Sequence, residues 1–286
     1  MPRESCIAAN ELFVLAFRET DAVPQLQFVT TAVLPLSLKP HKSSQNSTMA
    51  PKLVLFLGLI LPWNFSVAEG ARVHNAKHQV TYRGTTHDSV EHFQNVRYGH
   101  ETSGNRRFSP PEPYIPPPGV EIDATSPGPA CPQTKDAMLP FFSETGEMSE
   151  DCLNLRIARP VPATMTSNSK LPVVVWIHGG GVVKGSAYDP HSEPDKLIKL
   201  STSIGKPLIF VAINYRLTAF GFARLPILKE QRSLNVGLRD QREAMKWVKD
   251  NIEAFGGDPD KITVFGLSSG GTFSSLHLMA YGGEKG

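Results

Sequence analysis

The sequence predicts an α/β protein with a mostly parallel central sheet, and three stretches support this class. Two apolar runs, 171–177 and 208–214, lack regular polar alternation, which is typical of strands buried on both faces of a parallel sheet. Between 238 and 255, apolar residues recur at near-helical spacing with polar residues between them, which predicts an amphipathic helix. Because strands and helices alternate along this part of the chain, we expect helices to pack on the sheet as crossovers.

The remaining elements follow from shorter patterns. The six prolines between 109 and 118 predict an extended loop, and 123–150 is expected to be loop-rich. Short helical segments are expected at 195–202 and, after the last strand, at 269–281. Gly256-Gly257 should end the long helix, with a turn at Asp258-Pro259. Aromatic and β-branched residues near turn residues predict further strands at 79–82, 90–98, 153–157 and 262–265.

Length and composition limit the functions to consider. A chain of 286 residues suggests one large domain or two small ones, and 40% hydrophobic residues allow a sizeable core. The net charge is only +2 and the basic residues are scattered, so nucleic acid is not expected as a partner. No Cys-x-x-Cys or His/Cys cluster has metal-ligand spacing, so neither a metal nor a cofactor is expected.

The first 68 residues are not expected to belong to the folded domain. Met49 begins a short basic segment that ends at Lys52, and an apolar run over 53–63 follows it. Small residues up to Ala68 then provide a cleavage site, so the whole pattern is that of a secretory signal peptide. The apolar run is too short for a comfortable membrane span. A buried core helix is the alternative interpretation of this run.

The position of this signal leads to a hypothesis about the chain's start. Signal peptides stand at the beginning of a chain, so we expect Met49 to be the initiator and residues 1–48 to be a non-native upstream extension. Cleavage near Ala68 would release a secreted chain, 69–286, without an integral membrane segment. N-terminal sequencing of the secreted protein tests this, because a mature terminus upstream of Met49 would contradict it.

The chain contains three cysteines, so at most one internal disulfide can form. If the chain begins at Met49, Cys6 is absent and only Cys131 and Cys152 remain. Two cysteines in a secreted chain are candidates for a disulfide, and closing a loop of this length contributes about 3 kcal/mol in the chain-entropy account. Two free buried thiols are the alternative.

Two glycine-rich motifs follow predicted strands and carry the candidate chemistry. Gly266-Leu-Ser-Ser-Gly270 has the Gly-x-Ser-x-Gly pattern, in which the serine sits on a strained turn between strand and helix with its hydroxyl exposed. A glycine-rich turn without a catalytic role is the alternative for this pentapeptide alone. His178-Gly-Gly-Gly181 follows the strand 171–177, and backbone N–H groups in such a loop can turn toward one point, as an oxyanion hole requires.

Further stretches, in the same order along the chain, resemble one family. On them the chain resembles the type-B carboxylesterase/lipase family, the cholinesterase-like branch of the α/β-hydrolases, and most resembles its secreted fungal members. The resemblance implies that 69–286 forms the N-terminal half of an α/β-hydrolase fold. Besides the two glycine motifs, the matching stretches include Phe93-Gln-Asn-Val-Arg-Tyr98, Ser149-Glu-Asp-Cys-Leu-Asn-Leu155, Asn214-Tyr-Arg-Leu217, Asn235-Val-Gly-Leu-Arg-Asp-Gln241 and Phe255-Gly-Gly-Asp-Pro259.

The same resemblance implies an activity and assigns roles to residues. It implies a serine carboxylic ester hydrolase in which Ser268 attacks the carbonyl of a small-molecule ester or lipid and forms an acyl-enzyme. The oxyanion donors would be the backbone N–H groups of Gly180, Gly181 and Ser269. It also implies that the two cysteines of the domain pair with each other.

The sequence departs from the family pattern in two ways. Leu267 stands where many members carry Glu, which weakens the case for a cationic substrate. The family places the triad acid and His well beyond the nucleophile, but His277 is the only histidine after Ser268, and the helix leaving the elbow would carry it away. We therefore expect a C-terminally truncated chain without the triad acid and His, with little activity and an exposed sheet edge that favours aggregation.

Two other interpretations stay open. The chain could be a non-catalytic cholinesterase-like module for binding or adhesion, although such relatives usually lose the nucleophile that is present here. Alternatively, a gene model that stops short could explain the truncation, in which case downstream genomic sequence would encode the missing acid and His.

Overall fold

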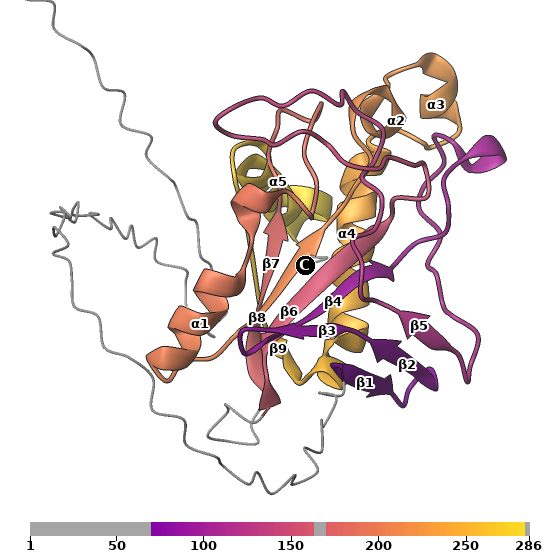
Figure 1. The fold of residues 1–286 in the computed structure, drawn as a ribbon. Coiled ribbons are helices and arrows are strands. Elements are labelled where there is room, and N and C mark those ends of the chain that lie inside the picture. Colours follow the sequence, from indigo (N-terminus) through magenta and orange to yellow (C-terminus); the bar gives the residue numbers. More distant parts are fainter. Residues whose placement is uncertain (1–69, 163–169, 284–286) are drawn as a thin grey trace, which may run out of the picture. The chain divides into compact units, whose positions relative to one another are not determined.

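The computed structural model describes residues 70–162 and 170–283, and this part of the chain contains two sheets. The larger, six-stranded sheet has the order β3-β4-β6-β8-β7-β9, and a three-stranded sheet has the order β1-β2-β5 (Figure 1). The expected extension, 1–48, and signal peptide, 49–68, lie outside the described residues. The strands are β1 (Arg72–Asn75), β2 (Val80–Arg83), β3 (Thr85–His87), β4 (Val90–Arg97), β5 (Glu121–Asp123), β6 (Asn154–Pro160), β7 (Leu171–Ile177), β8 (Ile209–Ile213) and β9 (Gly257–Gly266).

The larger sheet is mixed, which corrects the expectation of a mostly parallel sheet. β7 pairs in parallel with β8 and β9, but the pairs β3–β4, β4–β6 and β6–β8 are antiparallel. A two-residue turn at Asp88 and Ser89, both with positive φ, joins β3 to β4 and imposes the antiparallel pairing. No α-helix lies between β4 and β6 to serve as the crossover that parallel strands need.

Helices cover both faces of the larger sheet. Because side chains alternate along a strand, neighbouring residues of β7 enter different cores. Val175 belongs to the core cluster that contains Val248 of α4, whereas Trp176 packs against the cluster that contains Ile198 of α1. The helices α1 and α4 therefore lie on opposite faces (Figure 1). The α-helices are α1 (Asp195–Ser203), α2 (Thr218–Phe222), α3 (Pro226–Glu230), α4 (Val236–Asn251) and α5 (Ser269–Met279).

A buried ion pair joins the end of β8 to α4. The guanidinium of Arg216 donates from Nε and Nη2 to the two carboxylate oxygens of Asp240, over 2.8 and 2.7 Å. The backbone N–H of Arg216 donates to the same carboxylate over 3.0 Å. Both side chains are buried, so the pair fixes the chain where it leaves the sheet toward α2.

Most expected elements are present with their ends shifted by one or two residues, but β6 ends three residues later than expected and β9 begins five residues earlier. The expected long helix is α4, which continues as a 3₁₀ turn to Phe255 and ends at Gly256 with φ 84°. One expectation at this point was wrong, because Asp258 and Pro259 lie within β9 rather than in a turn. The short elements β1, β3, β5, α2 and α3 were not expected from the sequence.

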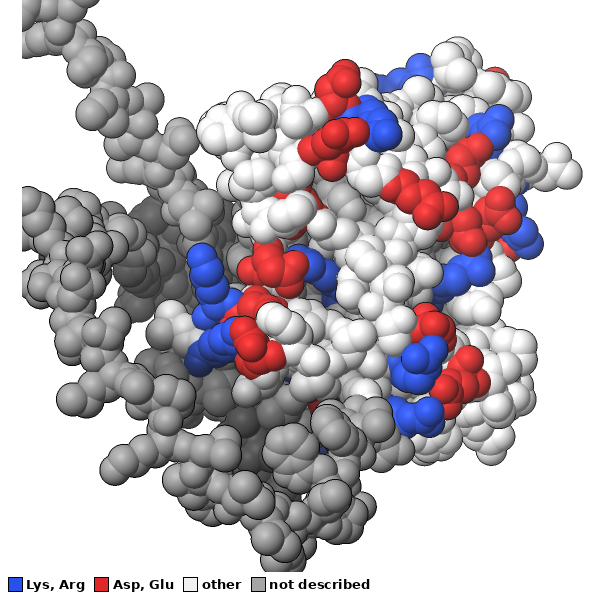
Figure 2. Space-filling model, viewed as in Figure 1, with Lys and Arg blue, Asp and Glu red and all other residues white. Residues whose placement is uncertain are grey.

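The charge of the surface and the length of the helices indicate which partners to consider. Acidic and basic side chains intermix on the face shown in Figure 2, in keeping with the net charge of +2. Within 70–162 and 170–283, none of the helices combines the length and the apolar character that crossing a bilayer would need.

Candidate active site

The Gly-x-Ser-x-Gly pattern forms a sharp turn between β9 and α5. Ser268 caps the N-terminus of α5 with φ 51° and ψ −119°, a conformation that non-glycine residues rarely adopt, and it is exposed. A Cβ on Gly266 would lie 2.4 Å from the carbonyl carbon of Gly270, and one on Gly270 would lie 2.0 Å from the carbonyl oxygen of Ile177. Both glycines are therefore needed for the close contact among β9, α5 and the end of β7.

The glycine loop after β7 lies directly beside this turn. A Cβ on Gly179 would lie 2.6 Å from the carbonyl oxygen of Leu267 and 3.2 Å from Cβ of Ser268. The next two glycines have φ of 102° and 60°, a left-handed conformation that glycine adopts without strain. The structure thus brings together two motifs that are far apart in the sequence.

Three backbone N–H groups near Ser268 have no acceptor. Across the residues that the structure describes, the N–H groups of Gly180, Gly181 and Ser269 donate no hydrogen bond. The N–H of Ser269 is at the N-terminus of α5, where the partial positive charge of the helix favours an anion. Three free donors beside an exposed serine could bind a developing oxyanion.

His178 at the start of this loop is held as a structural residue. The ring is buried, its Nδ1 lies 3.0 Å from the carbonyl oxygen of Gly179, and it stacks on Tyr215 with ring centroids 4.4 Å apart. Burial lowers the pKa of His178 to about 4, so the imidazole is neutral at pH 7. The contacts with Gly179 and Tyr215 give His178 a structural role in the loop.

The only histidine after Ser268 points away from it. His277 lies on α5 and is buried against α4, where its Nε2 is 2.8 Å from Oε1 of Gln241. Burial lowers its pKa to about 4. No side chain in the described ranges forms a hydrogen bond with Oγ of Ser268, so the described residues contain a candidate nucleophile without a paired base.

The disulfide loop supports the glycine loop from its other end. Cys131 and Cys152 form a disulfide with Cα atoms 5.0 Å apart, as expected. Within this loop, the amide of Gln133 pairs with the N–H and the carbonyl of Gly185, each over 2.8 Å. The ammonium group of buried Lys184 donates to the Thr134 carbonyl and to the Thr145 hydroxyl, each over 3.1 Å. Sequence reasoning did not find these two supporting residues.

An open pocket of about 270 Å³ lies next to the turn, and most of its wall is apolar or aromatic. Leu267, which precedes the candidate nucleophile, and Gly179 of the glycine loop both line it. The apolar part of the wall is formed by Phe141, Trp176, Leu197, Phe210 and Phe265, and its polar part includes Asp189, His191 and Glu193.

Comparisons with known proteins agree with this geometry. The model of the carboxylesterase family matches residues 76–285. A secreted lipase of Arthroderma benhamiae is 47% identical over 209 residues, which cover 72% of this chain and 36% of the lipase. An inactive carboxylesterase-like protein of Byssochlamys spectabilis, VdtD, is 46% identical over 202 residues, which cover 70% of this chain and 34% of that protein. The chain thus spans about a third of the length of these curated relatives.

A solved structure gives the same result. A thermophilic PNB esterase superposes with a TM-score of 0.65 at 37% identity, covering 75% of this chain and 42% of the esterase. This likeness bears out the α/β-hydrolase fold expected from the sequence. With the family match over most of the domain, it shows that the chain belongs to the carboxylesterase family.

Proposed function

We propose that this chain carries the nucleophile and the oxyanion hole of a serine carboxylic ester hydrolase. Ser268 would attack an ester carbonyl, the alcohol would leave, and water would release the acid from the acyl-enzyme. The observation that supports this most is the group of three unpaired backbone N–H groups, on Gly180, Gly181 and Ser269, beside an exposed serine with positive φ.

The oxyanion hole would supply the electrostatic part of catalysis. Negative charge develops on the carbonyl oxygen as Oγ of Ser268 attacks, and fixed N–H donors stabilise it without reorganisation. Removal of one such donor in other hydrolases costs on the order of 10²–10³ in kcat. The disulfide loop, through Gln133 and Lys184, would keep the donors in place.

The pocket beside Leu267 supports an uncharged substrate group. Its aromatic and aliphatic wall suits an acyl or alkyl chain of a small-molecule ester or a lipid. The residue before the nucleophile is a leucine, so it supplies no carboxylate for a cationic alcohol such as choline. Two carboxylates that line the pocket, Asp189 and Glu193, already contact His191 and Arg156.

The proton-transfer part of the machinery is missing from the described residues. His178 and His277 are buried and hydrogen-bonded elsewhere, so neither can take the proton from Ser268. We therefore propose that this chain alone hydrolyses esters slowly, since an oxyanion hole and binding without the triad leave only ~10³-fold catalysis over water.

Hydrolysis of p-nitrophenyl butyrate by the purified chain tests the proposal. We expect weak turnover that Ser268→Ala abolishes, while Ser275→Ala on the same helix has no effect. Turnover as fast as that of an intact esterase would contradict the proposal that this chain lacks the general base. Equal turnover by wild type and Ser268→Ala would contradict the assignment of the nucleophile.

A non-catalytic binding module is the second candidate. Its support is the relative named as an inactive carboxylesterase-like protein, which is 46% identical to this chain. A fluorophosphonate probe separates the two functions, because covalent labelling at Ser268 needs a reactive serine and an oxyanion hole. The test uses a longer version that includes a triad acid and His, because a serine without its base reacts slowly. There, labelling of wild type but not of Ser268→Ala supports the hydrolase, and absence of labelling supports the binding module.

We further propose that 69–286 is the esterase domain of a secreted protein, with a signal peptide at 49–68 and an upstream extension at 1–48. The family match begins at residue 76, and one relative is named a secreted lipase. Expression of the chain from Met1 and from Met49 in a fungal host tests this. Only the chain from Met49, whose signal peptide then stands at its beginning, should yield a secreted protein that begins near Glu69.

A further inference from the structure

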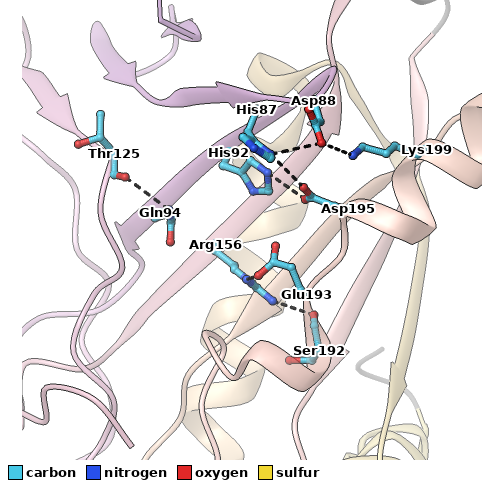
Figure 3. Close-up of polar contacts among 10 residues, drawn as sticks. All are labelled: His87, Asp88, His92, Gln94, Thr125, Arg156, Ser192, Glu193, Asp195 and Lys199. Atoms are coloured by element: carbon cyan, nitrogen blue, oxygen red, sulfur yellow. Dashed lines mark hydrogen bonds and ion pairs between the residues drawn. The ribbon is translucent and has the colours of Figure 1, made fainter. Parts of the chain in front are cut away.

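A cluster of histidines and carboxylates lies on the α1 face of the larger sheet, and one of its members, Glu193, also lines the pocket beside Leu267. His87 at the end of β3 and His92 in β4 face Asp195, the first residue of α1, and Glu193 precedes it by two residues (Figure 3). One ligand atom of each of His92, Glu193 and Asp195 lies within 4.8 Å of the other two. Each is a side chain that binds metal ions in proteins.

The hairpin register explains why the two histidines meet. Thr85 of β3 is directly opposite His92 of β4, so their side chains lie on the same face. His87 is two residues after Thr85 and therefore shares that face. The five-residue separation between His87 and His92 therefore places the two imidazoles on the same face of the β3–β4 hairpin.

Asp195 is the centre of the cluster. Its Oδ1 lies 3.0 Å from Nε2 of His92, and its Oδ2 lies 3.8 Å from Nδ1 of His87. Oδ1 is nevertheless buried without a hydrogen-bond partner, because the contact with His92 lacks hydrogen-bond geometry. A metal ion at ~2.0–2.2 Å from each ligand holds an imidazole nitrogen and a carboxylate oxygen ~3 Å apart, without a proton between them.

The neighbouring cations do not neutralise Asp195. Lys199 pairs with Asp88 over 3.0 Å, and Arg156 donates to Oε2 of Glu193 over 2.9 Å and to the carbonyl of Ser192. Each is engaged with an oxygen other than those of Asp195 (Figure 3). Oε1 of Glu193 remains available as a further ligand.

We propose that His92, Glu193 and Asp195, with His87 as a fourth ligand, bind one divalent transition-metal ion of the Zn²⁺ class. The ion ties the β3–β4 hairpin, at the edge of the sheet, to the N-terminus of α1. Two imidazoles with carboxylate oxygens suit Zn²⁺ and Co²⁺, whereas Ca²⁺ and Mg²⁺ take oxygen ligands only. Sequence reasoning did not find this site, because its ligands come from two pairs of residues about a hundred positions apart.

The test is metal binding by the whole chain, produced without a histidine tag and in a Cys6→Ser background. Cys6 is not part of the disulfide, and its replacement prevents a free thiol from binding the metal. Isothermal titration calorimetry with Zn²⁺, and visible absorption with Co²⁺, should show one ion per chain. Ca²⁺ and Mg²⁺ should not compete.

Variants identify the ligands. His87→Gln changes an exposed side chain and leaves packing intact, and we expect it to weaken Zn²⁺ binding by ~10-fold or more, as do His92→Gln and Asp195→Asn. His74→Gln, an exposed histidine on β1, is the matched control and should bind as wild type does. Glu193→Gln is not used, because it would leave buried Arg156 unpaired.

Thermal unfolding gives a second measurement. Zn²⁺ at 100 times the wild-type dissociation constant should raise the melting temperature of wild type and of His74→Gln, and should raise that of His87→Gln by about half as much or less. The proposal is overturned if wild type binds no Zn²⁺ at micromolar protein concentration, or if His87→Gln and Asp195→Asn bind as tightly as the control. Neither outcome depends on ester hydrolysis.

Discussion

The hydroxyl of Tyr215 donates a hydrogen bond of 2.9 Å to the carbonyl oxygen of His178, and the two rings stack at an angle of 16°. Tyr215 follows β8, whereas His178 follows β7 and begins the glycine loop. The ring of Phe273 from α5 packs edge-on against Tyr215 with centroids 5.7 Å apart. One phenol therefore connects the loop of the proposed oxyanion hole to the helix that begins after Ser268.

Tyr215→Phe keeps the stacking and removes this hydrogen bond. The carbonyl of His178 then loses its partner, so we expect the free energy of unfolding to fall by about 1–2 kcal/mol in urea titration. If the hydrogen bond also positions the loop, fluorophosphonate labelling should slow by more than the lower stability explains. Tyr114→Phe, a partly exposed tyrosine in the proline-rich loop, should change neither quantity.

Gly270→Ala should be far more harmful than Gly271→Ala, although the two residues are adjacent on α5. The new Cβ at 270 would lie 2.0 Å from the carbonyl oxygen of Ile177, a backbone atom that cannot move independently. At 271 the closest atom is 3.2 Å away. We expect a loss of at least ~3 kcal/mol for the first variant and a change within ~1 kcal/mol for the second, measured by urea unfolding. Similar stabilities would show that the turn can relax.

The sequence predicts the elements around Ser268 well because each depends on local signals. An uninterrupted apolar run marks β7, helical periodicity marks α4, and glycines mark both loops. The fold follows from these signals together with the family resemblance. The antiparallel half of the sheet was not predicted, because its pairing depends on a turn at Asp88 and Ser89 that has no glycine and whose positive φ values a sequence pattern does not reveal.

The supporting residues of the candidate site were harder to predict for a different reason. Tyr215 was part of a matching stretch, but its role depends on the distance between the ends of β7 and β8. Gln133 of the disulfide loop contacts Gly185, which is 52 positions later in the sequence. Lys184, which follows the glycine loop, contacts Thr134 and Thr145 of the disulfide loop, 50 and 39 positions earlier. Such contacts arise only when the chain is folded, so residue types and spacing alone do not report them.

Asp240→Ala should strongly destabilise the domain. It leaves Arg216 charged and buried with 2% of its side chain exposed, which costs about 3–5 kcal/mol. The double variant Arg216→Met, Asp240→Leu removes both charges and should recover much of this loss. Urea unfolding of the three proteins measures the difference. If the double variant is no more stable than Asp240→Ala, the buried charge is not the cause of the loss.

Stability should decrease with acidity because of His277. Burial lowers its pKa to about 4, below the value of about 6.5 expected in the unfolded chain. Between these values the unfolded chain binds more protons, so the free energy of unfolding is highest above pH 6.5 and falls as the pH decreases toward 4. His178 contributes in the same direction, since its pKa is also about 4.

His277→Gln retains a hydrogen-bonding partner for Gln241 but cannot titrate, so its stability should fall less between pH 6.5 and 4. Urea unfolding at several pH values in this range measures the two slopes, with His74→Gln as the exposed control. Equal slopes for wild type and His277→Gln would mean that His277 remains accessible to protons in the folded protein.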